Sequence, residues 1–290
     1  MKFQTPLPIL GALVGLTVLA DAQTTSKSPT IWLASDVIDM KVVDPKGEKL
    51  GKVEDVVVHP GGETAYAVLS FGGTLGMGDK LFAMPWSVLR TTEAETSKKD
   101  SDRSIVLPLD KERLKNAPGF DKAHWPVLAS ADWAKDIDAY YLTEAGGNVK
   151  RPVEAGARTS VITWKCSDLK GADVKTPTGE KLGDIEEIAI DTNGRVNYVA
   201  VSVGGFLGMG ESHVAVPWDA LKFSLEGEKG DTKVITLATT KQQLEKAPRF
   251  KPGKDKVAEM TDPKWIGGVY DYYSVQPYWP RSQAKQDQGR

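Results

Sequence analysis

The chain has 290 residues, of which 40% are hydrophobic and 26% charged, and its formal net charge is -2. This composition excludes a disordered chain, and the length allows two globular domains that each have their own core. The acidic and basic residues are interspersed, whereas binding to nucleic acids or anionic membranes needs a clustered basic surface. We therefore expect no nucleic-acid partner.

The N-terminus is predicted to be a cleaved signal peptide. A positive charge precedes an apolar run at residues 9–20, and an Ala-Asp-Ala motif places cleavage between Ala22 and Gln23. The run is shorter than the roughly 20 apolar residues that span a bilayer, so an uncleaved anchor is the weaker alternative. We expect a periplasmic or secreted protein with no stable membrane insertion after cleavage.

The segment that follows is predicted to be a succession of short β-strands. Valine, aromatic and alternating apolar residues are typical of strands, and Pro, Gly and Asp separate them. Asp110 is expected to cap a short helix over residues 110–116, which Pro118 ends. Short strands with brief helices favour a closed barrel or a sandwich, since closure removes unpaired strand edges. The expected strands are residues 40–43, 53–58, 65–71, 81–84 and 104–109.

The second half of the chain repeats the first. A shift of 132 residues places residues 32–89 on residues 164–221 without a gap and with roughly 40% identity, which indicates a duplication. A segment rich in Gly and Pro between the copies is typical of a linker. The predicted organisation is a signal peptide (1–22), a disordered N-terminus (23–30), a first domain (31–143), a linker (144–160), a second domain (161–275) and a polar tail (276–290).

Several motifs occur in both copies: Ser35-Asp36 and Ser167-Asp168, the GEKLG segments at 47–51 and 179–183, and the glycine-rich segments that lead to Pro85-Trp86 and Pro217-Trp218. Together they resemble the PRC-barrel family, which is named for the photosynthetic reaction-centre H subunit and also occurs in a ribosome-maturation factor. The resemblance implies a mainly β fold of two tandem, small, six-stranded PRC-like β-barrels with short helical extensions. It also implies assembly or docking rather than catalysis, so we expect no enzyme activity and no cofactor.

Each copy carries a glycine-rich segment with apolar side chains, GGTLGMG at 72–78 and GGFLGMG at 204–210. A phosphate site is not expected there, because an apolar strand follows rather than a helix. The apolar groups could bind a partner or fold back to plug the barrel end, and plugging is the alternative we favour. The candidate partner-binding residues are Leu75, Met77, Phe206, Leu207 and Met209.

A pair of carboxylates also recurs: Glu54 with Asp55, and Glu186 with Glu187. Neighbouring strand residues point to opposite faces, so one acid of each pair is expected in solvent and the other near the inner side or end of the barrel. These acids could bind a cation at the barrel mouth, or they could accept hydrogen bonds from backbone N–H groups in a turn. We favour the second alternative.

The remaining candidates for chemistry do not recur. Cys166, the only cysteine, aligns with Ala34, which indicates a small buried side chain rather than a nucleophile. No histidine is repeated and no two lie at a metal-ligand spacing, so no metal site is expected. We therefore predict non-catalytic binding of an envelope protein. The alternative is a small-molecule or metal-ion binding protein that uses the cleft between the barrels.

Overall fold

A computed structural model describes most of both copies, here called the first repeat (31–143) and the second repeat (161–275). The predicted signal peptide, the predicted disordered N-terminus, both glycine-rich segments and nearly all of the predicted linker lie outside the described residues. The described residues are 31–71, 80–92, 103–126, 131–144, 163–203, 212–227, 232–250 and 262–279.

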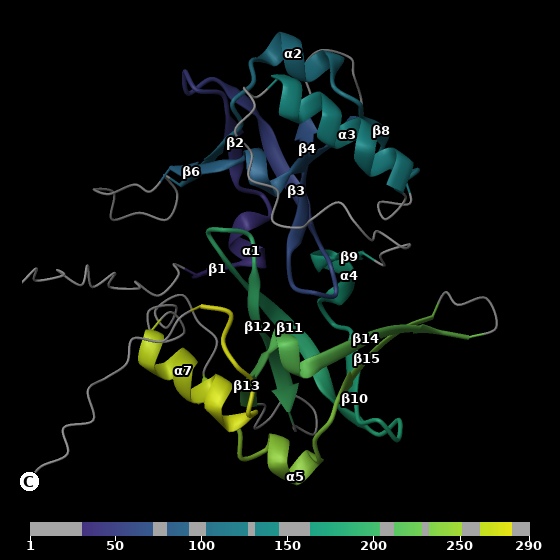
Figure 1. Cartoon of the computed structure of the whole chain (residues 1–290), viewed down its shortest axis with the longest axis vertical. Coiled ribbons are helices and arrows are strands. Elements are labelled where there is room, and N and C mark those ends of the chain that lie inside the picture. The colour runs from purple at the N-terminus through teal and green to yellow at the C-terminus, as the bar shows by residue number, and fades with distance from the viewer. Residues whose placement is uncertain are drawn as a thin grey trace, which may run out of the picture. The chain divides into compact units, whose positions relative to one another are not determined.

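The two repeats contain matching series of elements (Figure 1). The first repeat comprises β1 (Ile31–Leu33), α1 (Ala34–Val37), β2 (Lys41–Val43), β3 (Lys49–Val58), β4 (Thr64–Phe71), β5 (Lys80–Pro85), η1 (Trp86–Val88), β6 (Arg90–Thr92), β7 (Ser104–Val106), α2 (Lys111–Asn116), β8 (Phe120–Asp121) and α3 (Ala131–Glu144). The second comprises β9 (Trp164–Lys165), α4 (Cys166–Leu169), β10 (Asp173–Lys175), β11 (Lys181–Asp191), β12 (Val196–Val203), β13 (Ser212–Pro217), η3 (Trp218–Ala220), β14 (Leu221–Glu226), β15 (Thr232–Leu237), α5 (Lys241–Leu244), β16 (Arg249–Phe250) and α7 (Pro263–Tyr272).

Each repeat builds one sheet in the same strand order. The orders are β6-β7-β2-β3-β4-β5-β8 and β14-β15-β10-β11-β12-β13-β16, and an eighth strand lies off each path. The mainly β fold with short helices is therefore confirmed. The expected closure is not seen, because within the described ranges the two end strands of each sheet do not pair with each other. The end strands β8 and β16 have only two residues each, so the ladders stop there.

The eighth strand of each sheet comes from the other repeat. β1 pairs antiparallel with β11, with Trp32 opposite Ile190, and β9 pairs antiparallel with β3, with Trp164 opposite Val58. We call β1–α1 and β9–α4 the exchanged segments. Because the exchange is reciprocal, each sheet is complete only when both repeats are present.

The helices follow local sequence signals. The predicted helix is confirmed as α2, where the Asp110 carboxylate accepts a hydrogen bond from Arg113 N at 2.9 Å. α7 begins with Pro263, and the Asp262 carboxylate accepts from Lys264 N at 2.7 Å. α3 packs against β5 and α7 against β13, although neither helix is among the elements expected from the sequence.

Aromatic side chains attach these two helices to their own sheets. Trp133 of α3 packs edge-on against Tyr66 with ring centroids 5.3 Å apart, and Trp265 of α7 packs in the same way against Tyr198 at 5.8 Å. All eight residues of β12 are buried, as expected of a central strand that is covered on both faces. None of the helices in the described residues is long and apolar enough to span a bilayer.

Candidate functional site

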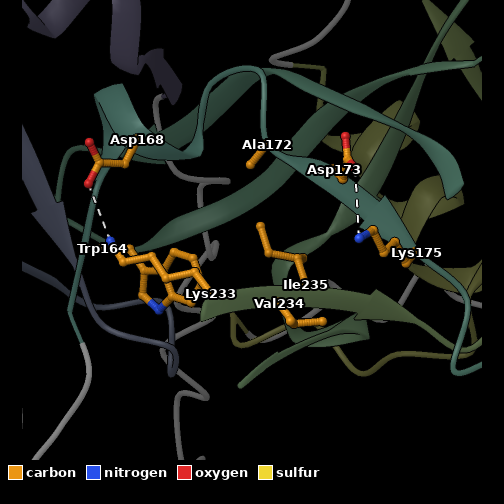
Figure 2. A pocket seen from close by; sticks show the side chains of 8 residues that line it. All are labelled: Trp164, Asp168, Ala172, Asp173, Lys175, Lys233, Val234 and Ile235. Atoms are coloured by element: carbon orange, nitrogen blue, oxygen red, sulfur yellow. Dashed lines mark hydrogen bonds and ion pairs between the residues drawn. The ribbon is translucent and has the colours of Figure 1, made fainter. Parts of the chain in front are cut away.

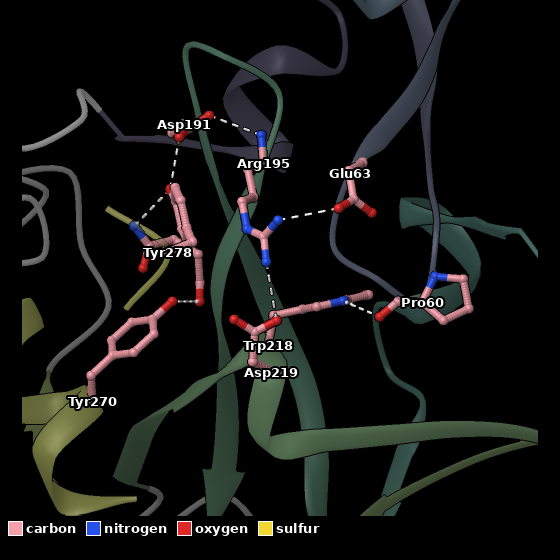
Figure 3. Close-up of polar contacts among 9 residues, drawn as sticks. Pro60, Glu63, Asp191, Arg195, Trp218, Asp219, Tyr270 and Tyr278 are labelled. Carbon is pink, nitrogen blue, oxygen red and sulfur yellow. Dashed lines mark hydrogen bonds and ion pairs between the residues drawn. The ribbon is translucent and has the colours of Figure 1, made fainter. Parts of the chain in front are cut away.

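The tips of two hairpins, β3–β4 and β11–β12, meet where the repeats join (Figure 3). Thr64 N donates to Gly194 O at 2.6 Å, and Val196 N donates to Gly62 O at 2.7 Å. We call this region the turn contact; it consists of residues 60–64 and 191–196 together with Trp86 and Trp218. It continues the hydrogen bonding of the sheets from one repeat into the other.

The repeated Pro-Trp motif forms the apolar part of the turn contact. Trp218 is fully buried, and its indole Nε1 donates to Pro60 O of the first repeat at 2.8 Å. A Cβ atom on Gly62 would lie 2.9 Å from Trp218 Cδ1, and a Cβ atom on Gly194 would lie 2.2 Å from Trp86 Cδ1. Each tryptophan thus lies against the turn glycine of the other repeat, where no larger residue fits.

A half-buried ion pair lies at the centre of the turn contact. The Arg195 guanidinium donates to Glu63 Oε1 at 3.1 Å and to Asp219 Oδ1 at 3.4 Å. Glu63 and Arg195 occupy the same position in the aligned repeats. Positions that are equivalent in sequence therefore face each other in space and carry opposite charges.

Beside this pair lies Tyr278, which falls in the segment predicted to be the polar tail (276–290). The Tyr278 hydroxyl donates to the buried Asp191 carboxylate at 2.7 Å, and its ring lies 4.6 Å from the Arg195 guanidinium. Burial, together with the negative charge of Asp191, raises the pKa of Tyr278. The phenol therefore stays protonated and keeps donating to Asp191.

The recurring carboxylates hold the exchanged segments. Asp55 on β3 accepts hydrogen bonds from the hydroxyl of Ser167 and, at 3.2 Å, from its backbone N–H. In the other sheet, Glu187 on β11 accepts from the backbone N–H of Ser35 at 3.3 Å. Because these N–H groups lie in the first turns of α4 and α1, each acid satisfies donors of a helix from the other repeat.

Matching irregularities in β3 and β11 position these acids. The register shifts between Val53 and Asp55 in one strand and between Ile185 and Glu187 in the other, which leaves Glu54 and Glu186 as the extra residues. Such a bulge redirects side chains, and here it leaves Asp55 only 3% exposed while half-buried Glu54 pairs with Lys122. The backbone N–H and the hydroxyl group that donate to Asp55 from a distant segment belong to Ser167 of the other repeat. The sequence does not indicate this contact between repeats.

Asp55 is expected to make stability depend on pH. Burial raises the pKa of Asp55, and hydrogen bonds from Ser167 and Val56 oppose the rise in part. A raised pKa means that protonation stabilises the folded state, an effect present below the unfolded pKa and lost as pH rises through the folded pKa. The free energy of unfolding of the wild type should therefore fall relative to that of Asp55→Asn as pH rises above about 4, measured by urea denaturation.

Asp121→Asn is the control, and its effect on stability should change with pH in the opposite direction. A hydrogen bond from Ala123 N lowers the pKa of Asp121, so its contribution to stability is present above the unfolded pKa and lost as pH falls through the folded pKa. The wild type should gain stability relative to this variant as pH rises. A difference between the wild type and Asp55→Asn that stays constant with pH would contradict our account of Asp55.

Cys166 lies in α4 and is buried. Burial raises the pKa of its thiol well above the ordinary value, and the negative charges of Asp55 and Glu187 act in the same direction. The thiolate is the nucleophilic form of cysteine, so this environment disfavours nucleophilic chemistry at Cys166. Within the described part of the chain, no group of three or more His, Cys, Asp or Glu side chains is arranged to hold a metal ion.

The candidate partner-binding residues Leu75, Met77, Phe206, Leu207 and Met209 lie outside the described residues. The strands that lead into their segments are described. β4 starts at the turn contact with Thr64 and ends at Phe71, and β12 likewise starts there and ends at Val203. Both glycine-rich segments therefore follow the strand ends that are remote from the turn contact.

Glu63 and Arg195 are important parts of the site that sequence reasoning missed, whereas Tyr278 belongs to the aromatic residues concentrated near the end of the second repeat. A signal for the first two is present, since aligned positions of a duplicated domain carry opposite charges.

The comparison with known families agrees with this geometry. The family model for the PRC-barrel domain matches residues 30–114 and 164–244, together more than half of the chain. Each matched segment includes one exchanged segment and extends into the short helix of its repeat, α2 after β7 or α5 after β15. No curated protein matches the chain. The chain belongs to the PRC-barrel family and contains two copies of its domain.

Proposed function

We propose that this protein is a non-catalytic binding and assembly module of the bacterial cell envelope, in which two PRC-barrel domains act as one unit. The observation that carries the proposal is the reciprocal exchange of β1–α1 and β9–α4 between the sheets. The polar residues that recur in both repeats, Ser35 with Glu187 and Asp55 with Ser167, hold this exchange together. The recurrence of these polar residues is therefore explained by their role in assembling the fold.

We propose that a partner binds at the two glycine-rich segments, and the test below separates this from plugging of the domain, the alternative that the sequence favours. Each follows a strand of eight residues, which spans about 26 Å from the turn contact. The turn contact thus does not include these strand ends. Because the paired sheets hold both ends in one unit, two weak contacts with one partner can combine into a much stronger interaction.

The predicted signal peptide supports an envelope location, and the buried state of Cys166 is compatible with it. A single buried thiol forms no internal disulfide and is protected from external oxidants. We expect the mature protein to begin at Gln23 and to appear in the periplasmic or extracellular fraction. Mass spectrometry of the purified native protein measures this directly.

The binding proposal is tested by Met77→Asp combined with Met209→Asp. A charge placed on each apolar segment should weaken partner binding by about a hundredfold, since both contacts and their avidity are lost. Photo-crosslinkers at the same two positions in intact cells, followed by mass spectrometry, identify the partner. Lys222→Asp on β14 is the control, because Lys222 is exposed and lies in neither segment.

The outcomes separate clearly. One dominant crosslinked protein that is lost in the double variant, with unchanged thermal stability, supports the proposal. If both positions stay uncrosslinked in a folded and exported protein, the segments plug the domains and do not bind a partner. Equal losses in the double variant and in Lys222→Asp would show a non-specific effect of charge.

A further inference from the structure

A cavity of about 310 Å³ lies in the second repeat, beside its exchanged segment (Figure 2). α4 and β9 form one side and strands β10 and β15 form the other. The lining residues are Trp164, Asp168, Ala172, Asp173, Lys175, Lys233, Val234 and Ile235.

The cavity coincides with a break in the parallel pairing of β10 and β15. The first repeat pairs Lys41 with Ser104 and continues through the next two positions of β2 and β7. In the second repeat the pairing starts one step later, at Val174 with Ile235, so Asp173 and Val234 do not pair with each other. These two residues line the cavity, which therefore opens where the two strands separate.

One end of the cavity holds the Asp168 carboxylate between two lysines. Asp168 is shared by two lysines, with Lys165 Nζ at 3.0 Å from one carboxylate oxygen and Lys233 Nζ at 3.3 Å from the other. Lys233 also lies over the Trp164 ring at 4.7 Å from its centroid. An incoming anion can bind Lys233 while Asp168 keeps its ion pair with Lys165.

Trp164 also lines this end of the cavity. Trp164 is only 1% exposed, and its indole Nε1 has no hydrogen-bond partner among the described residues. The rest of the lining includes the apolar side chains of Ala172, Val234 and Ile235.

We propose that this cavity binds a small monocarboxylate with an apolar tail. The carboxylate pairs with the Lys233 ammonium near Trp164, and the tail lies against Ala172, Val234 and Ile235. The Lys233 ammonium selects an anion over a neutral or cationic molecule of the same shape. This site is independent of the partner-binding segments, so either proposal can fail without the other.

The test compares three six-carbon probes on the mature chain: hexanoate, hexanamide and hexylamine. We expect hexanoate to bind about tenfold more tightly than hexanamide, as one charge-assisted contact provides, and hexylamine not to bind. Isothermal titration calorimetry measures affinity. The indole N–H signals in ¹⁵N-edited NMR spectra show whether a buried tryptophan senses the ligand.

Two variants with opposite effects locate the site. Lys233→Gln should weaken hexanoate binding about tenfold, while Asp168→Asn should tighten it because the competing carboxylate is removed. Lys222→Gln on the neighbouring strand β14 is the matched control and should change nothing. Equal affinities for hexanoate and hexanamide, weaker binding by Asp168→Asn, or equal effects of the two lysine variants would overturn the proposal.

Discussion

Gly194→Ala is expected to lower the free energy of unfolding by about 3 to 4 kcal/mol, among the largest effects of any single methyl group in this chain. Two costs add. Gly194 has a φ of +81°, which an L-residue adopts only with strain, and its new Cβ would lie 2.2 Å from Trp86 Cδ1 and 2.5 Å from Nε1. The tryptophan is buried and belongs to the other repeat, so relief requires the two repeats to move apart.

A graded series separates the two costs. Gly179→Ala carries the same backbone strain at a φ of +89° but has open space around the new Cβ, so it should cost only about 1 to 2 kcal/mol. Gly62→Ala should fall between them, because Trp218 Cδ1 is 2.9 Å away. Urea denaturation measures all three. Equal losses at Gly194 and Gly179 would contradict the packing of Trp86 against the turn.

The second large effect is expected from Trp32→Ala. Trp32 belongs to the first repeat, but it lies in β1, is 5% exposed and pairs with Ile190 of the second repeat. Removal of a large buried side chain should cost about 3 to 5 kcal/mol. The substitution should destabilise the sheet of the second repeat. Amide hydrogen exchange should therefore speed up most in β11 and β12.

Trp133→Ala provides the matched control. Trp133 is also in the first repeat, but it packs edge-on against Tyr66 of its own sheet at 5.3 Å. Its removal should speed hydrogen exchange in β4 and leave β11 little changed. If Trp32→Ala also accelerated amide hydrogen exchange mainly in β3 and β4, our assignment of β1 to the sheet of the second repeat would be wrong.

Much of the fold can be predicted from the sequence because its signals are local. Alternating apolar residues mark the long strands, and Asp110 followed by a helix that ends before Pro118 marks α2. The duplication needs only an alignment of the chain with itself. The exchange of β1 and β9 has no local signal, because a short apolar strand can pair with either sheet equally well.

The candidate site is predicted less well for a related reason. The sequence identifies Asp55, Glu187, Ser35 and Ser167 as recurring, but their pairing crosses between repeats and depends on a bulge in each strand. Spacing along the chain does not show such a bulge. The cavity beside Lys233 lies where one strand pair is missing, which is a difference between two related repeats rather than a motif.

The opposite charges of Glu63 and Arg195 have a consequence for how this duplicated protein can assemble. If two copies of the first repeat joined through the same turns, they would bring two Glu63 carboxylates together, and two copies of the second would bring two Arg195 guanidinium groups together. Like charges in a half-buried contact repel, so each repeat discriminates against its own kind and selects the other. Duplication followed by this charge difference turns a self-complementary interface into one between two different, complementary surfaces. Such an interface favours correct pairing within one chain over mispairing between chains.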